Sequence, residues 1–201
     1  MRIKKSIKPQ RIIICAFNIF FVIFWAFLVV LFSISIVNKK FVYPIKHYEY
    51  ISKYSNEYGV DSALILATIK VESNFNKNAV SSKGAVGLMQ IKEDTASYIA
   101  SMLGEEEFNL KDEETNVRYG TYYLKYLFEK FKNVQVVICA YNAGEGNVSL
   151  WLNDKTKSKD GKTLEVVPFL ETQNYLNKIL KARKKYIKLY PKILDKQNNI
   201  S

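Results

Sequence analysis

The chain has 201 residues, among them 30 basic and 19 acidic residues that give a formal net charge of +11 at pH 7. This length suits one ordinary domain plus an appendage. Its two cysteines, Cys15 and Cys139, fall in different parts of the chain, and its single histidine is His47. This composition argues against a disulfide inside the domain, a metal site or a serine–histidine triad.

An apolar run at residues 12–37 carries no charged side chain and follows a basic segment at 1–11 with five Lys or Arg. The run exceeds the roughly 20 apolar residues that cross a bilayer as a helix. We therefore predict a single transmembrane anchor, with the basic segment in the cytoplasm and the remainder outside the cell. A cleaved signal peptide is the alternative, but it would have an apolar region of only about 7–15 residues and a small-residue cleavage site.

The remainder of the chain is predicted to be mostly helical. Residues 38–50 form a tether, in which Pro44 blocks a continuous helix. A domain then spans 51–190, followed by a tail at 191–201. Glycines after the first and third helices and Asp61 before the second supply the boundaries. The expected helices are 46–57, 62–73, 94–103, 113–131, 135–141 and 169–190, with polar loops between them.

Glu72 lies at the end of the apolar second helix. Ile65, Thr68 and Ile69 share its helix face, an environment that disfavours a carboxylate and raises its pKa. A carboxylic acid that stays protonated near neutral pH can protonate the leaving oxygen in glycosidic bond cleavage. A glutamate that simply faces solvent at a helix end is the alternative.

The segment that follows Glu72 favours the catalytic interpretation. It contains Gly84, Gly87 and Gln90 among polar side chains and returns at once to a helix. Such a loop suits the wall of a cleft that binds a hydroxyl-rich ligand.

Four short motifs occur in order along this domain: ES at 72–73, GLMQ at 87–90, YNAG at 141–144 and PFLETQNY at 168–175. With them and with NVRYGTYYL at 116–124, the chain resembles the transglycosylase SLT domain family from Ile51 to Tyr186. That family comprises lytic transglycosylases with a goose-type lysozyme-like fold, so the resemblance implies a lysozyme-like helical domain.

The resemblance also implies residue roles. Glu72 matches the single catalytic acid and base, and Tyr141 matches the tyrosine whose hydroxyl approaches it. Ser73 is expected to tie the loop, and Met89 has core packing as an alternative role. The residues matched to substrate binding are Ser81 near the acetamido group, Met89 and Gln90 in the cleft wall, Tyr141, Asn142, Glu171 and Tyr175.

The chain departs from the family pattern at a few positions. Lys92-Glu93 replaces the usual Met-Pro, Glu145 and Asn147 stand where Pro and Arg are common, and Gln173 replaces a frequent arginine. These departures concern substrate contacts and cleft charge.

The resemblance implies cleavage of the bond between N-acetylmuramic acid and N-acetylglucosamine in peptidoglycan glycan strands, with formation of 1,6-anhydromuramyl ends and without cofactor or metal. A muramidase is the nearest alternative and would require a second carboxylate, for which Asp94, Glu145 and Glu171 are candidates. A non-catalytic wall-binding module is the second alternative. The membrane is also expected as a partner, through the N-terminal helix. Nucleic acid is not expected, because no basic stripe is interleaved with aromatic residues.

Overall fold

The computed structural model describes residues 9–191, 193 and 194; the side chains of residues 9–17, 35 and 40 are not described. Most of the predicted segments at 1–11 and 191–201 therefore lie outside the described residues. The chain divides into two compact units, Met1–Pro44 and Ile45–Ser201.

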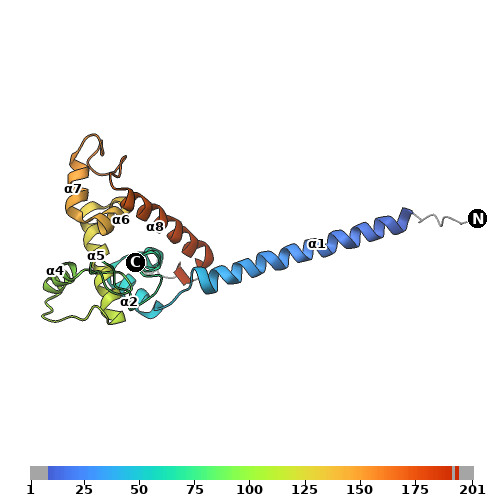
Figure 1. Cartoon of the computed structure of the whole chain (residues 1–201), viewed down its shortest axis with the longest axis horizontal. Helices are drawn as coiled ribbons and strands as arrows, with labels where there is room; N and C mark the ends of the chain where they lie inside the picture. The colour runs from blue at the N-terminus through green and yellow to red at the C-terminus, as the bar shows by residue number, and fades with distance from the viewer. Residues whose placement is uncertain (1–8, 192, 195–201) are drawn as a thin grey trace, which may run out of the picture. The chain divides into compact units, whose positions relative to one another are not determined.

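The first unit consists of helix α1 (Pro9–Val37), followed by a short π-helix, η1 (Asn38–Val42). Figure 1 shows α1 as one continuous helix. Its apolar side chains from Ile19 to Val37 are exposed wherever they are described. No helix of the described part of the chain has the length and apolar character needed to cross a membrane.

The second unit is mostly helical, as the sequence predicts. Apart from isolated bridges that Val86 makes to Val80 and Ile91, its described residues form helices and loops. The helices are α2 (Tyr48–Tyr58), α3 (Ser62–Glu72), α4 (Glu93–Leu103), α5 (Glu113–Phe131), α6 (Val134–Ala143), α7 (Glu145–Asn153) and α8 (Leu170–Leu189). Six of these match the predicted helices within a few residues.

Helix α7 was not predicted. Its sequence, EGNVSLWLN, includes Gly146 and Asn147, which are poor helix formers. Val148, Trp151 and Leu152 are buried, so tertiary packing stabilises a helix that local propensity does not favour.

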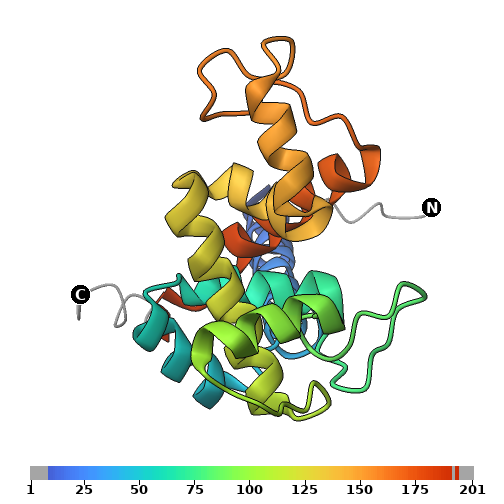
Figure 2. The same cartoon turned by 90° about the vertical axis from the view of Figure 1, so that its left-hand side faces the viewer.

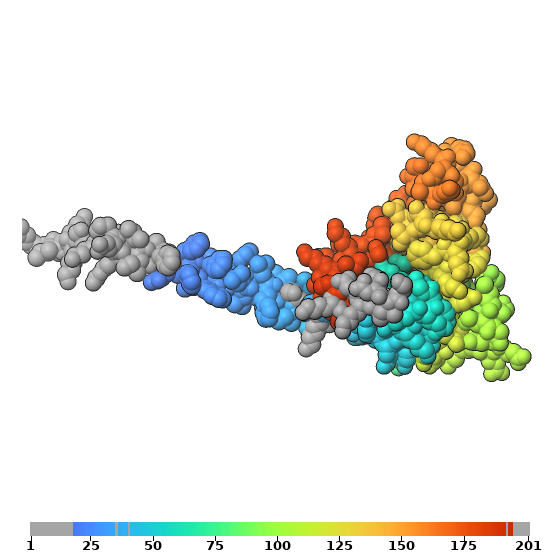
Figure 3. All heavy atoms as spheres, turned by 180° about the vertical axis from the view of Figure 1, so that it is seen from behind, coloured from blue at the N-terminus to red at the C-terminus, as the bar shows by residue number. Residues whose placement is uncertain are grey.

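Helix α3 lies at the centre of this unit. All of its residues from Ser62 to Ile69 are buried, and α8 packs against both α3 and α6. Figure 3 shows α8 beside the yellow α6 segment on one face of the unit. The carboxylate of Asp61 caps α3 by accepting from the Ala63 amide at 2.9 Å, and it also accepts from Arg183 of α8. The helix that ends in Glu72 is thus fixed at its beginning and along its length.

Candidate active site

Glu72 is the last residue of α3 and lies in a cleft of about 460 Å³. The hydroxyl of Tyr175 donates a hydrogen bond to Glu72 Oε1 at 2.7 Å. Burial raises the pKa of Glu72 to about 7; the hydrogen bond from Tyr175 opposes this rise, and the charge of Glu171 adds to it. The surroundings of Glu72 thus raise its pKa, as the sequence predicts.

Residues of the loop between α3 and α4 form one wall of the cleft. Figure 2 shows this loop projecting from the helices of the unit. Ser73 ties this loop to the helix, because its hydroxyl donates to the Leu88 carbonyl at 2.8 Å; the expected structural role of Ser73 is confirmed. Gln90 adopts a left-handed backbone with φ of 50°. Its side-chain amide donates to the carbonyls of Ala79 and Gly87 at 3.1 and 3.0 Å.

Asn116 of α5 holds the same loop through hydrogen bonds to its backbone. Its side chain accepts from the Met89 amide at 2.8 Å and donates to the carbonyls of Val86 and Leu110, both at 2.9 Å. Asn116 is 1% exposed. Gly87 lies against it with φ of +82°, and a Cβ there would be 2.2 Å from the Asn116 amide nitrogen. Asn116 thus provides hydrogen-bond partners for backbone groups of the loop. The sequence did not reveal this role, although Asn116 lies in the matched segment NVRYGTYYL.

Met89 belongs to the core. Its side chain is fully buried and packs so closely on α5 that a Cβ at Gly120 would be 2.4 Å from its sulfur. Its backbone carbonyl accepts a hydrogen bond from the Tyr141 hydroxyl at 2.9 Å. Met89 therefore supports the cleft wall from behind and does not line the cleft with its side chain.

The two tyrosines predicted for the site differ in their partners. Tyr141 lines the cleft with Glu72, but its hydroxyl is hydrogen-bonded to Met89. The hydroxyl bonded to the Glu72 carboxyl group is that of Tyr175, which is buried on α8. A contact across 103 positions of the chain leaves no signature in local spacing.

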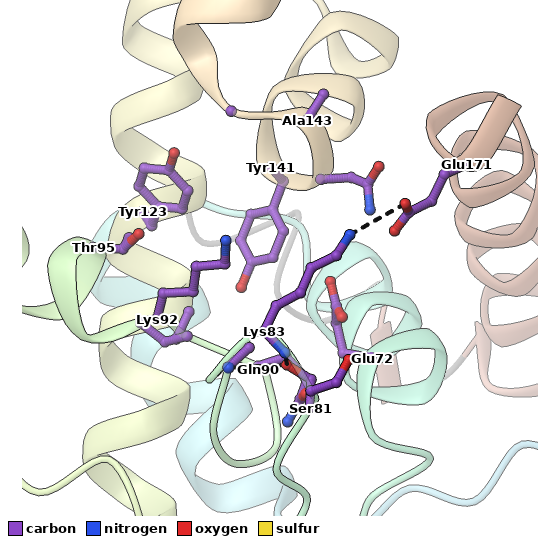
Figure 4. Close-up of a pocket in the computed structure, with 15 residues that line it drawn as sticks. Glu72, Ser81, Lys83, Gln90, Lys92, Thr95, Tyr123, Tyr141, Ala143 and Glu171 are labelled. Atoms are coloured by element: carbon purple, nitrogen blue, oxygen red, sulfur yellow. Dashed lines mark hydrogen bonds and ion pairs between the residues drawn. The ribbon is translucent and has the colours of Figure 1, made fainter. Parts of the chain in front are cut away.

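Three further predicted residues, Ser81, Asn142 and Glu171, also line the cleft. Figure 4 shows Ser81 and Glu171 with Glu72. Ser81 accepts from the Ala85 amide at 3.0 Å, which organises the loop. Asn142 accepts from the hydroxyl of Thr172 at 2.8 Å, so the orientation of its amide is fixed. Glu171 forms an ion pair with Lys83 at 3.4 Å across the cleft.

Glu171 is the only other acidic residue that lines this cleft among the described residues. Glu145 accepts hydrogen bonds from Tyr126 and Lys130, both at 2.8 Å, outside the cleft. Asp94 lies in the first turn of α4 and is exposed. Of the three candidates for a second carboxylate, the structure brings only Glu171 to the cleft.

Solved structures of other proteins share this arrangement of helices. The lytic transglycosylase Slt of Pseudomonas aeruginosa, an inactive mutant, superposes with a TM-score of 0.64 and 28% identity, over 73% of this chain and 24% of that one. The 70 kDa soluble lytic transglycosylase of Escherichia coli gives 0.65 and 28%, over 76% and 26%. The second unit is therefore a lysozyme-like helical domain.

The chain belongs to the transglycosylase SLT domain family, whose model matches residues 49–164. The soluble lytic murein transglycosylase of Escherichia coli K12 is 32% identical over 69% of this chain and 22% of the relative. The membrane-bound lytic murein transglycosylase C of Photorhabdus laumondii is 34% identical over 70% and 46%. The matched region thus spans less than half the length of these relatives.

Proposed function

We propose that this protein is a lytic transglycosylase that cleaves the β-1,4 bond between N-acetylmuramic acid and N-acetylglucosamine in peptidoglycan. The observation that carries the proposal is the position of Glu72: its side chain lines a polar cleft, and the pKa of its carboxyl group is raised to about 7. Membership of the family and the names of the relatives support the same activity.

In the first step, Glu72 donates its proton to the glycosidic oxygen as positive charge develops on the muramyl ring. The bond between C1 and this oxygen breaks, and the N-acetylglucosamine side leaves with a free 4-hydroxyl group. The hydroxyl of Tyr175 donates to the resulting carboxylate and stabilises it.

In the second step, the Glu72 carboxylate accepts the proton of the 6-hydroxyl of the same muramyl residue. The 6-oxygen then bonds to C1, which gives a 1,6-anhydromuramyl end and returns Glu72 to its protonated form. The nucleophile belongs to the same sugar, so its attack has a small entropic cost and no water is consumed. One carboxyl group is sufficient for both proton transfers.

We further propose that the cleft-lining residues Ser81, Gln90, Tyr141, Asn142 and Glu171 contact the sugars. All five line the cleft that contains Glu72. The hydrogen bonds that hold Ser81, Gln90 and Asn142 keep their polar groups in place before substrate binds.

Hydrolysis by a muramidase is the second candidate, because Glu171 lies in the same cleft and could activate water. Mass spectrometry of the glycan ends released from purified peptidoglycan separates the two reactions. The proposed reaction gives anhydromuramyl ends, whereas hydrolysed ends are heavier by one water. Hydrolysed ends alone would replace the transglycosylase proposal with a muramidase, and no released ends would favour a wall-binding module.

We also propose that residues 12–37 anchor the protein in the cell membrane, with the SLT domain outside the cytoplasm and facing the wall. The uncharged apolar sequence, the basic residues before it and the membrane-bound relatives support this anchor. The protein should sediment with membranes at full length, and protease added to spheroplasts should remove the domain. A soluble form that begins near Asn38 would instead show cleavage.

A further inference from the structure

Lys92 provides an unpaired positive charge in the proposed catalytic cleft. It precedes α4, its side chain lines the cleft, and Figure 4 shows its ammonium group extending into the cleft on the side of Tyr141. Among the described residues, no carboxylate lies within 4.0 Å of this ammonium group. Glu93 and Asp94 follow it in sequence, but neither lines the cleft.

The other charges of the cleft largely cancel. Lys83 and Glu171 form an ion pair with each other. Glu72 carries no charge in the protonated form that begins the proposed reaction. A positive charge therefore remains at Lys92 when the cleft is ready to bind substrate.

The sugar hydroxyl and acetamido groups of a peptidoglycan strand are neutral, and its anionic groups are carboxylates. We propose that Lys92 binds a carboxylate of the glycan strand and so makes this cleft selective for strands that present one there. This inference rests on the proposed function, since it takes a muramyl glycan as the ligand. It assigns a specificity role to a position where the chain departs from the family pattern.

Two sources can supply this carboxylate. In a strand without peptides, each muramyl residue carries a free lactyl carboxylate. In a strand with peptides, the lactyl group is an amide and the carboxylates belong to the stem peptide. The shared chemistry is a carboxylate within reach of a lysine ammonium group, and the choice of probe distinguishes the sources.

Binding is measured by isothermal titration calorimetry with the full chain in a non-ionic detergent. All proteins carry Glu72→Gln, so the probes are not cleaved. The probes are a peptide-free tetrasaccharide of alternating N-acetylglucosamine and N-acetylmuramic acid, its lactyl N-methylamide, the tetrasaccharide with stem peptides, and a neutral chitotetraose. Lys92→Gln is compared with Lys92→Arg, which keeps the charge, and with Lys111→Gln, which removes an exposed lysine outside the cleft.

Lys92→Gln should weaken binding of at least one carboxylate-bearing probe by roughly three- to tenfold, with a smaller effect at high salt. Loss confined to the peptide-free tetrasaccharide identifies the lactyl carboxylate, and loss confined to the peptide-bearing probe identifies the stem peptide. The N-methylamide and the chitotetraose should bind Lys92→Gln and its parent equally. Lys92→Arg and Lys111→Gln should retain the parent affinity for every probe.

Equal affinity of Lys92→Gln and its parent for both carboxylate-bearing probes would overturn the proposal, as would an equal loss for the neutral probes. Because these measurements require no turnover, they are independent of the reaction that the cleft performs. If the parent protein with Glu72 intact released no anhydromuramyl ends, the proposed function would fail while the binding result for Lys92 remained valid.

Discussion

The two carboxyl groups of the cleft belong to regions with opposite surroundings. Glu72 ends a buried helix, accepts a hydrogen bond from a buried tyrosine and has a pKa raised to about 7. Glu171 lies in the first turn of α8, where 71% of its side chain is exposed, and forms an ion pair with Lys83. The same side chain is thus suited to proton transfer in one region and to a surface ion pair in the other, because burial disfavours the charged form and solvent does not.

The largest expected effect comes from removing the acidic proton of Glu72, the carboxyl group in the buried region. Glu72→Gln keeps the shape of the side chain but cannot donate an acidic proton, so release of anhydromuramyl ends should fall by roughly three orders of magnitude or more. The variant should fold, with unchanged far-UV circular dichroism, and should still bind peptidoglycan. Glu129→Gln, an exposed change outside the cleft, should keep wild-type turnover. A folded Glu72→Gln protein with near wild-type turnover would show that the catalytic acid lies elsewhere.

The region around Glu72 also depends on the loop between α3 and α4, which Asn116 holds in place. Asn116→Ala removes three hydrogen bonds and leaves the buried Met89 amide and Leu110 carbonyl without this partner. The free energy of unfolding should fall by about 2–4 kcal/mol, measured by urea denaturation. Asn147→Ala, which removes one exposed hydrogen bond to Ala143, should cost less than about 1 kcal/mol. Equal losses for the two variants would contradict a special role of Asn116.

The hydrogen bond from Tyr175 is a second feature that separates Glu72 from the exposed Glu171. This bond lowers the pKa of Glu72, so Tyr175→Phe should move that pKa above about 7. Because the reaction begins with the protonated acid, kcat/KM falls as pH rises through the pKa of Glu72. The falling limb of the profile should therefore shift to higher pH.

The rate at the pH optimum should also decrease in Tyr175→Phe, by about tenfold, since the carboxylate formed during proton transfer loses a donor. The measurement is the pH dependence of anhydromuropeptide release from pH 5 to 9. A shift of the falling limb to lower pH, or no shift, would show that Tyr175 does not act on Glu72 in the working enzyme.

Local features were sufficient to predict the acidic residue and most helices. The apolar neighbours Ile65 and Ile69 identified the sheltered position of Glu72, and Asp61, Gly59 and Gly104 marked helix boundaries that the structure reproduces. These signals lie within a few residues of the feature that they predict, so periodicity and capping chemistry are enough to recognise them.

Contacts between distant segments could not be predicted in this way. The partner of Glu72 is Tyr175, and the loop after α3 is held by Asn116; both contacts join segments that are far apart in sequence. In the sequence, Lys92 is only a departure from the family pattern. That its charge lies unpaired in the cleft follows from the structure, because segments distant in sequence form the cleft. Helix α7 was missed because the burial of Trp151 stabilises it and its own propensity does not.

The smallest expected effect comes from the exposed region. Glu171→Gln removes an ion pair between exposed side chains, so the free energy of unfolding should change by less than about 1 kcal/mol. The charge of Glu171 raises the pKa of Glu72, and its removal should therefore lower that pKa. The falling limb of the pH profile should shift to lower pH, opposite to the shift in Tyr175→Phe.

Turnover of Glu171→Gln at pH 6 should decrease by less than tenfold, because the proposed reaction needs no second carboxylate. A loss of about a hundredfold or more, the size expected for a general base, would instead assign Glu171 to the activation of water and make the enzyme a muramidase.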